Sequence, residues 1–139
     1  MASFFSKRCE YGLQAVIYLA SKENNALCSA KEISEELSIP KEFISKILQD
    51  LTEKGIIFSR KGRDGGFKLA VNANEIKLID VVEAVDGLDI FNSCILGFHN
   101  CKKYKKCFLK DEWRDILNQT YLMLSKETVS NFKEKILHT

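Results

Sequence analysis

Residues 40–55 carry the pattern that most constrains how this chain can fold. Pro40 is suited to the first turn of a helix and Gly55 to its C-terminal end. Between them, apolar side chains recur at i, i+3, i+4 and i+7, which predicts a helix with one buried stripe. The stripe consists of Ile44, Ile47, Leu48 and Leu51. The opposite face presents four polar side chains, Lys41, Ser45, Lys46 and Gln49.

The segments on either side of this helix predict a winged helix-turn-helix. Residues 6–21 are expected to form a first helix, and a capping box from Ser29 to Glu32 begins a short second one. After Gly55 the period changes, and residues 56–59 and 66–70 are expected to pair as a hairpin across a charged, glycine-rich turn. Helix, helix, turn, helix and hairpin is the order of elements in that fold.

The remaining chain is expected to be helical. Residues 78–86 predict a short helix that Gly87 ends, and a long helix follows from about residue 108 to residue 126. Six residues lie on one side of it: Trp113, Ile116, Leu117, Thr120, Tyr121 and Leu124. A small domain cannot easily bury so much of a terminal helix, so we interpret this side as a homodimer contact. The alternative is that the helix folds back on its own domain.

Polar and basic side chains are placed where such a fold meets DNA. The third helix of a helix-turn-helix enters the major groove, where Gln49 is suited to adenine and Ser45 to several bases. Lys41 and Lys46 suit phosphates or guanine. The hairpin turn adds Arg60, Lys61 and Arg63, and an arginine there could enter the minor groove. Each charge alone is typical of a solvated surface, but together they predict binding to double-stranded DNA.

The predicted fold class is therefore mainly α with a small β-hairpin wing. It combines a winged helix-turn-helix with a long C-terminal dimerisation helix. Residues 1–75 are expected to form the DNA-binding domain, and residues 76–107 a connecting helix and a cysteine-bearing loop. Residues 108–139 are expected to form the dimerisation helix and a C-terminal segment.

Composition excludes several other classes. No run of 18 apolar residues is present, and the opening residues MASFFSKRCE lack the apolar core of a signal peptide. We therefore expect a cytoplasmic protein without a membrane partner, in which the five cysteines stay reduced. With only two histidines, no nucleotide-binding loop and no Ser–His–acid set, the sequence predicts neither an enzyme nor a small-molecule substrate.

Three cysteines, Cys94, Cys101 and Cys107, lie close together after the predicted short helix. Five lysines and no acidic residue accompany them in residues 94–110: Lys102, Lys103, Lys105, Lys106 and Lys110. Cationic neighbours favour the thiolate, the form of cysteine that binds metals and reacts with oxidants. Three soft ligands on one short loop indicate a bound metal or an iron–sulfur cluster.

Several stretches resemble the Rrf-type family of iron–sulfur cluster regulators, which includes IscR-like and NsrR-like proteins. They are Glu10-Tyr-Gly-Leu, residues 39–57, Arg60-Lys-Gly-Arg-Asp-Gly-Gly-Phe-Lys-Leu-Ala70, residues 79–87, the three cysteines and Trp113. The resemblance implies a dimeric bacterial transcription regulator, or repressor, that binds a pseudo-palindromic operator. It also implies an iron–sulfur cluster, [2Fe–2S] or [4Fe–4S], that senses redox state, nitric oxide or iron and cluster supply. Order in the loop 94–107 would set the spacing of the two recognition helices, whose half-sites lie about 34 Å apart or a multiple of it.

The fourth ligand of such a cluster stays open. The family often places a histidine three residues after the third cysteine, but this chain has Lys110, and a protonated lysine has no lone pair for a metal. The resemblance implies Glu10 of the partner subunit as the candidate ligand. His99, Cys9 and a small exogenous ligand are alternatives.

Two other readings of the cysteines compete with a cluster. A structural zinc site could use the three thiolates with His99 or Glu10, although zinc modules usually begin with a close CxxC pair, which is missing here. A metal-free thiol switch, or a module that binds only protein, is the other. Visible absorbance of the anaerobically purified protein distinguishes a cluster from a colourless zinc site. Salt-dependent binding to DNA fragments distinguishes a regulator from a protein-binding module.

Overall fold

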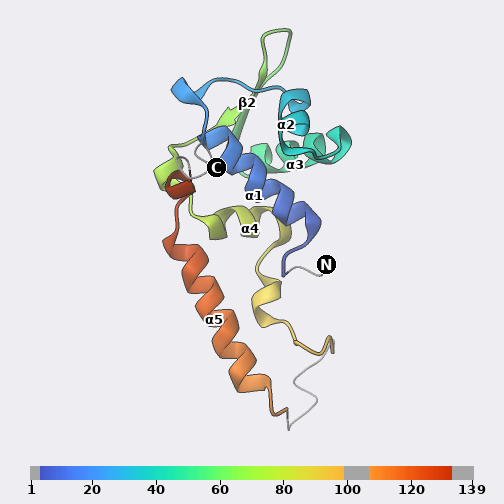
Figure 1. Ribbon diagram of the computed structural model, residues 1–139, viewed down its shortest axis with the longest axis vertical. Helices are drawn as coiled ribbons and strands as arrows, with labels where there is room; N and C mark the ends of the chain where they lie inside the picture. The colour runs from blue at the N-terminus through green and yellow to red at the C-terminus, as the bar shows by residue number, and fades with distance from the viewer. Residues whose placement is uncertain (1–3, 99–106, 133–139) are drawn as a thin grey trace.

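The computed structural model describes residues 4–98 and 107–132. Its long helices are α1 (Lys7–Ala20), α2 (Ala30–Leu37), α3 (Lys41–Glu53), α4 (Leu78–Asp86) and α5 (Lys110–Lys126). Its strands are β1 (Ile57–Arg60) and β2 (Gly66–Leu69), and its short 3-10 turns are η1 (Glu23–Asn25), η2 (Ala73–Glu75), η3 (Asp89–Asn92) and η5 (Val129–Phe132). The order helix, helix, helix, hairpin, helix, long helix is the order predicted from the sequence (Figure 1).

Helix α3 buries the stripe that its spacing predicts. Ile44, Ile47, Leu48 and Leu51 are at most 1% exposed. The helix ends where expected, because Gly55 adopts φ +80°, a left-handed conformation that glycine enters without steric cost. Pro40 lies just before the helix and not in its first turn, where it was predicted. It is the N-cap, and its carbonyl accepts from the backbone N of Phe43 and of Ile44 at 3.1 Å.

Helix α1 packs across α3 and α4 at the centre of the domain. Its inner face is buried at Ala15, Val16 and Leu19, as the periodicity predicts. Gly12 lies at the closest approach, since a Cβ there would stand 3.0 Å from Cγ2 of Val85. The absence of a side chain at Gly12 therefore lets the three helices close on one core.

The hairpin is antiparallel, with Ile57 opposite Leu69 and Arg60 opposite Gly66. Its strands differ by about one residue from the predicted bounds. The chain before α2 adds an unpredicted contact to its second strand. The backbone N of Cys28 donates to the carbonyl of Phe67 at 2.9 Å, and the N of Phe67 donates back at 2.8 Å. These two bonds attach the wing to the body of the domain.

The start of α2 is capped by Ser29, whose Oγ accepts from the backbone N of Glu32 at 3.0 Å. The predicted capping box also needs the Glu32 carboxylate to turn back to Ser29. In the structure that carboxylate instead accepts from Oη of Tyr18 at 2.9 Å and lies 3.5 Å from Nζ of Lys22. Glu32 thus ties α2 to the end of α1, a tertiary partner that the local pattern does not reveal.

Helix α5 starts at the end of the molecule far from the wing and runs back to the winged helix (Figure 1). Its C-terminal end docks on the segment that leads into α4: the backbone N of Leu78 donates to the carbonyl of Glu127 at 3.0 Å, and the N of Val129 donates to the carbonyl of Ile76 at 2.8 Å. Val129 is fully buried. The start of α5 lies beside residues 88–98, at the opposite end of the molecule from the wing (Figure 1). None of the helices in the described ranges has the length and apolar content needed to cross a membrane.

The predicted apolar side of α5 is divided in two. Leu117 and Leu124 are buried against the chain's own domain, at 3% and 6% exposure. Ile116 remains 52% exposed, and Leu109 and Met123 share its flank at spacings of seven residues with 42% and 53% exposure. The alternative prediction, that the helix folds back on its own domain, therefore holds for the flank of Leu117 and Leu124. The flank of Leu109, Ile116 and Met123 stays uncovered within one chain.

Candidate DNA interface and cysteine site

The outward face of α3 carries the side chains predicted to meet DNA. Lys41, Lys46 and Gln49 are exposed, and Ser45 is half-buried. Sequence reasoning missed Phe43, which is 52% exposed on the first turn of α3. A solvent-facing aromatic ring there is suited to contact a thymine methyl group. The signal in the sequence is an apolar residue that falls outside the stripe of α3.

A groove of about 620 Å³ joins this face of α3 to the wing. Gln49 lines it from α3, Arg60 and Lys61 line it from the hairpin, and Ser29 lines it from the start of α2. Arg63 lies exposed on the hairpin turn, beyond the residues that line the groove. The fold thus brings two basic side chains and one amide together on one concave surface, whose lining also includes the acid Glu53. The cations and the amide are suited to a nucleic-acid backbone and a base edge.

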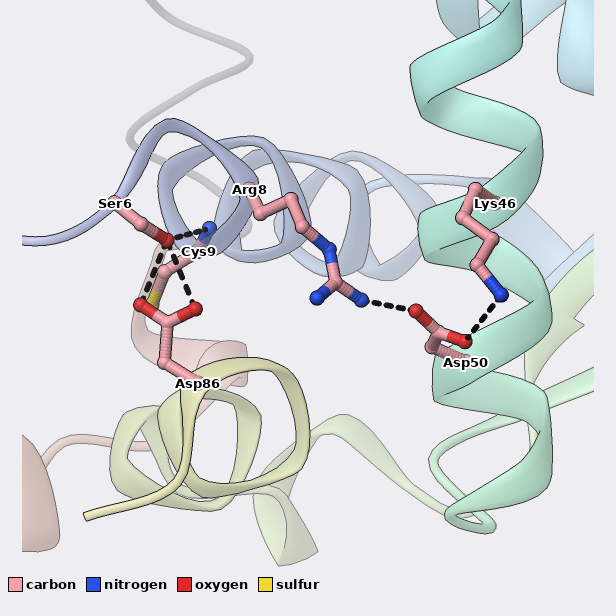
Figure 2. A network of polar contacts seen from close by, with 6 residues as sticks. All are labelled: Ser6, Arg8, Cys9, Lys46, Asp50 and Asp86. Carbon is pink, nitrogen blue, oxygen red and sulfur yellow. Dashed lines mark hydrogen bonds and ion pairs between the residues drawn. The ribbon is translucent and has the colours of Figure 1, made fainter. Parts of the chain in front are cut away.

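Lys46 is not a lone cation. Its Nζ lies 3.6 Å from Oδ1 of Asp50, one turn further along α3. Arg8 of α1 contacts the other oxygen of the same carboxylate (Figure 2). Sequence reasoning missed both Arg8 and Asp50, because their positions are 42 residues apart and neither belongs to a recognisable motif.

Two of the three predicted cysteine ligands line one cavity. Cys94 and Cys107 both border a space of about 510 Å³ between residues 91–95 and the start of α5, together with Lys110, Trp113 and Arg114. The indole Nε1 of Trp113 donates to the carbonyl of Ser93 at 2.9 Å and so holds the cysteine segment against α5. Cys101 and the alternative ligand His99 lie outside the described residues.

Backbone hydrogen bonds form a turn at each of these two cysteines. The carbonyl of Cys94 accepts from the backbone N of Gly97 at 3.0 Å, and Gly97 has φ +85°. The carbonyl of Cys107 accepts from the backbone N of Lys110 at 3.3 Å, at the start of α5. Within residues 4–98 and 107–132, no three His, Cys, Asp or Glu side chains lie close enough to hold a metal. A complete ligand set would therefore need a residue outside these ranges, such as Cys101, or a second chain.

Glu10 lies in the first turn of α1, where a carboxylate interacts favourably with the helix dipole. Its Oε1 is 3.3 Å from Nζ of Lys7, and its side chain is 26% exposed. Glu10 is not among the described residues that line the cavity of Cys94 and Cys107. Within one chain, its role is that of a partly exposed first-turn acid.

The other two cysteines belong to the core. Cys9 and Cys28 are 0% and 1% exposed. Burial raises the pKa of the Cys9 thiol to about 12, with Asp86 and Glu10 adding to the effect. Burial also raises the pKa of Cys28 to about 12, with Glu32 beside it. Both residues behave as small apolar side chains of the core, and Cys9 is not among the described residues that line the cavity of Cys94 and Cys107.

Comparison with known proteins agrees with this architecture. The sequence model of the Rrf2 family, described as "Iron-dependent Transcriptional regulator", matches residues 5–135. A protein of Aquifex aeolicus (strain VF5), named as an HTH-type transcriptional regulator, is 29% identical over an alignment of 138 positions, which covers 96% of this chain and 95% of that protein.

Solved structures of similar fold include two CymR proteins and an IscR. Staphylococcus aureus CymR is 26% identical, with a TM-score of 0.76 over 93% of this chain and 97% of that one. CymR of B. subtilis, described as the global cysteine regulator, has a TM-score of 0.77 at 21% identity, covering 97% and 98% of the two chains. IscR of T. potens has a TM-score of 0.76 at 20% identity, covering 95% and 87%.

The structural likenesses confirm the predicted fold class, mainly α with a β-hairpin wing. The matched family and relative are transcriptional regulators, which confirms the prediction that this protein is not an enzyme. The resemblance noted from the sequence is confirmed as well. Because the family match spans nearly the whole chain, this protein belongs to the Rrf2 family of DNA-binding transcriptional regulators.

Proposed function

We propose that this regulator acts as a homodimer whose binding to a pseudo-palindromic operator is controlled by an iron–sulfur cluster. Cys94, Cys101 and Cys107 would hold the cluster, with Glu10 of the partner subunit as the candidate fourth ligand. The signal would be redox state, nitric oxide or iron and cluster supply. Residues 1–75 would bind DNA, residues 76–107 would carry the sensor, and residues 108–139 would hold the dimer together.

The observation that carries the sensor proposal is the cavity shared by Cys94 and Cys107. Two thiols that are thirteen positions apart border the same space, and the Trp113–Ser93 hydrogen bond keeps their two segments side by side. Thiolates are the ligands that iron–sulfur clusters use most, so this donor set fits the group. When bound, the cluster would supply an iron–sulfur centre whose stability depends on oxidants and on iron.

The groove between α3 and the wing supports the proposed DNA interface. With α3 in the major groove, Gln49 and Ser45 would face base edges, and Lys41 and Lys46 would face phosphates or guanine. Arg60, Lys61 and Arg63 on the hairpin would contact the neighbouring backbone or the minor groove. Phosphate contacts of this kind would make the affinity fall steeply with salt.

The uncovered flank of α5 supports the proposed homodimer. Leu109, Ile116 and Met123 follow one another at seven-residue spacing, the spacing at which a helix packs along a second helix. A dimer built on this flank would place two copies of α3 at a fixed separation. Two helices at a fixed separation can dock only on half-sites with matching spacing.

Anaerobic purification tests the sensor directly. We expect a brown or red protein with charge-transfer absorbance and stoichiometric iron and sulfide, and we expect Cys107→Ser to lose both. Cys28→Ser is the matched control: Cys28 is a buried cysteine far from the three proposed ligands in the sequence, and this variant should keep the colour. A colourless protein with one zinc per chain would instead support the structural zinc site.

The fourth ligand and the control of DNA binding need separate measurements. The cluster of Glu10→Ala is expected to be lost in air faster than that of wild type. Glu10→Asp retains a carboxylate, so its cluster should be lost more slowly than that of Glu10→Ala. Operator binding is then compared between cluster-loaded and cluster-free wild type at one salt concentration. Equal affinities would contradict cluster control even if the cluster itself is present.

A metal-free thiol switch is the second candidate, and one comparison favours it. A further structure of Staphylococcus aureus CymR, 26% identical to this chain, is described as the oxidized form. A switch of this kind would show as a disulfide between two of the three clustered cysteines after mild oxidant, with a change in DNA affinity that a reductant reverses. It predicts no iron or sulfide in the anaerobic protein.

A further inference from the structure

An ion-pair network joins the first turn of α1 to the outward face of α3 (Figure 2). Nη2 of Arg8 donates to Oδ2 of Asp50, and Nζ of Lys46 lies 3.6 Å from Oδ1 of the same carboxylate. Because Arg8 and Asp50 are 42 positions apart, their contact belongs to the tertiary fold and not to one helix. Two cations therefore share one carboxylate on the helix proposed to read DNA.

The two cations differ in how firmly they hold Asp50. Arginine presents a planar fork that matches a carboxylate, and the Arg8 side chain is 46% exposed against 70% for Lys46. Lys46 precedes Asp50 by four residues on α3, and a cation N-terminal to its acid is the weaker orientation of such a pair. Arg8 therefore satisfies the carboxylate, and Lys46 is the partner that can leave it.

The turn that carries Arg8 is itself held in place. Oγ of Ser6 caps α1 by accepting from the backbone N of Cys9 at 3.1 Å. The same hydroxyl donates to the carboxylate of Asp86, whose two oxygens lie at 2.8 and 2.7 Å (Figure 2). Asp86 is the last residue of α4, so the first turn of α1 is attached to α4 on one side and to α3 on the other.

We propose that Arg8 is a positioning residue for DNA binding, which neutralises Asp50 and so frees Lys46 for a phosphate. The inference rests on the proposed use of α3 as the DNA-reading helix. Without Arg8, the Asp50 carboxylate would keep Lys46 as its only cation and would add a negative charge beside the DNA phosphates. Both effects weaken binding, although Arg8 itself touches no DNA in this scheme.

A double-mutant cycle tests the proposal. The probe is a duplex selected by the wild-type protein from a random-sequence library, and binding is followed by fluorescence anisotropy across a salt series. Arg8→Gln is expected to weaken binding by about three- to tenfold and to reduce the slope of log affinity against log salt by about one, the loss of one phosphate contact. Adding Asp50→Asn is expected to restore both quantities although Arg8 is still missing.

Rescue is the result that a direct DNA contact or a purely structural role would not give. If Arg8→Gln/Asp50→Asn binds as weakly as Arg8→Gln, or if Arg8→Gln binds like wild type, the proposal is wrong. Lys126→Gln removes one positive charge at the C-terminal end of α5, outside the proposed DNA interface, and should bind like wild type. If Arg8→Gln proves unfolded by circular dichroism, Asp50→Asn alone carries the test: weaker binding than wild type would overturn the proposal.

Lys46→Gln separates this inference from the proposed function. An unchanged affinity and salt slope in Lys46→Gln would contradict the use of this face of α3, and the Arg8 proposal with it. Weaker binding in Lys46→Gln without rescue in the Arg8–Asp50 cycle would overturn only the role of Arg8.

Discussion

The winged-helix part of the chain, residues 7–86, and the cysteine-bearing part, residues 88–126, treat their apolar side chains in opposite ways. The first part buries most of them around α1, α3 and α4, and its exposed large apolar side chains are Phe43, Phe58 and Val71. In the described residues of the second part, only Leu117 and Leu124 are buried among the large apolar side chains, and many others are exposed: Ile95, Leu96, Phe98, Phe108, Leu109, Ile116, Tyr121, Leu122 and Met123. The first part thus holds most of the core, to which Leu124 and Val129 also contribute, while the second presents surface that suits the proposed dimer and cluster.

The same truncation in both parts is the strongest way to break this comparison. Leu48→Ala removes a side chain that is 0% exposed, and it should lower the free energy of unfolding by about 2–5 kcal/mol. Leu122→Ala removes one that is 57% exposed, and it should cost about 0.5 kcal/mol or less. Urea unfolding at fixed protein concentration measures both. Equal losses would mean that the second part is packed as tightly as the first.

The attachment of the wing gives the next largest effect. Gly66 adopts φ +151°, and a Cβ there would lie 2.8 Å from the carbonyl oxygen of Cys28. Gly66→Ala should therefore cost about 1–3 kcal/mol in strain and weaken DNA binding by displacing the wing. Ser59→Ala, on the facing strand, adds no atoms and should leave the free energy of unfolding unchanged. Wild-type affinity in the Gly66→Ala variant would show that the wing does not need this attachment.

The exposed flank of α5 is tested by placing a charge on it. Ile116→Asp should weaken the homodimer at least about tenfold, or about 1.4 kcal/mol, because the carboxylate would have to be desolvated in the contact. Asn118→Asp makes the same carboxylate two positions on, about 160° away around the helix at 3.6 residues per turn, and should leave the dimer intact. Size-exclusion chromatography with light scattering reports the outcome. Identical masses for the two variants would place the dimer contact elsewhere.

The buried cysteines Cys9 and Cys28 should make the free energy of unfolding depend on pH above pH 9. Folding raises the pKa of Cys9 and of Cys28 from 9.0 to about 12, so the native state keeps protons that the unfolded state loses. Their stabilising contribution is full below pH 9 and is lost as the pH rises from 9 towards 12, by up to about 1.4 kcal/mol per pH unit for each thiol. Urea unfolding between pH 8.5 and 10.5 measures this slope.

Matched double variants assign that slope to the core. Cys9→Ala/Cys28→Ala should flatten the decline of stability above pH 9, because no buried thiol is left to hold a proton. Cys94→Ala/Cys107→Ala should leave the decline as steep as in wild type. A decline that follows the second pair of cysteines would contradict the burial argument.

Local periodicity was enough to predict most of the fold. The stripe of α3, the bounds 78–86 of α4 and the glycine stops at Gly55 and Gly87 follow from side-chain spacing and backbone freedom, which a sequence displays directly. For the cysteine site, the sequence could predict which residues are candidate ligands but not how they are arranged in space. That Cys94 and Cys107 border one cavity depends on the Trp113–Ser93 hydrogen bond, which involves a backbone carbonyl and therefore has no signature at position 93.

Contacts between distant segments were not predictable from the pattern. The bonds between Cys28 and Phe67 use only backbone atoms, so any residue pair could make them. The Arg8–Asp50 pair uses charges that are common on protein surfaces, and nothing in the sequence singles out these two among the other charged residues. Pairing of this kind becomes visible only when α1 and α3 are placed side by side.

The return of the chain at Val129 has a consequence for synthesis. Residues 7–86 leave the ribosome first, and the N-terminal part of a protein ordinarily folds as a unit while the rest is being made. Here one side of α1 and η2 is covered by η5, and the buried Val129 bonds to Ile76. The winged helix therefore completes its core only after α5 has been translated. A nascent chain therefore acquires its finished winged helix and the proposed sensor segment together.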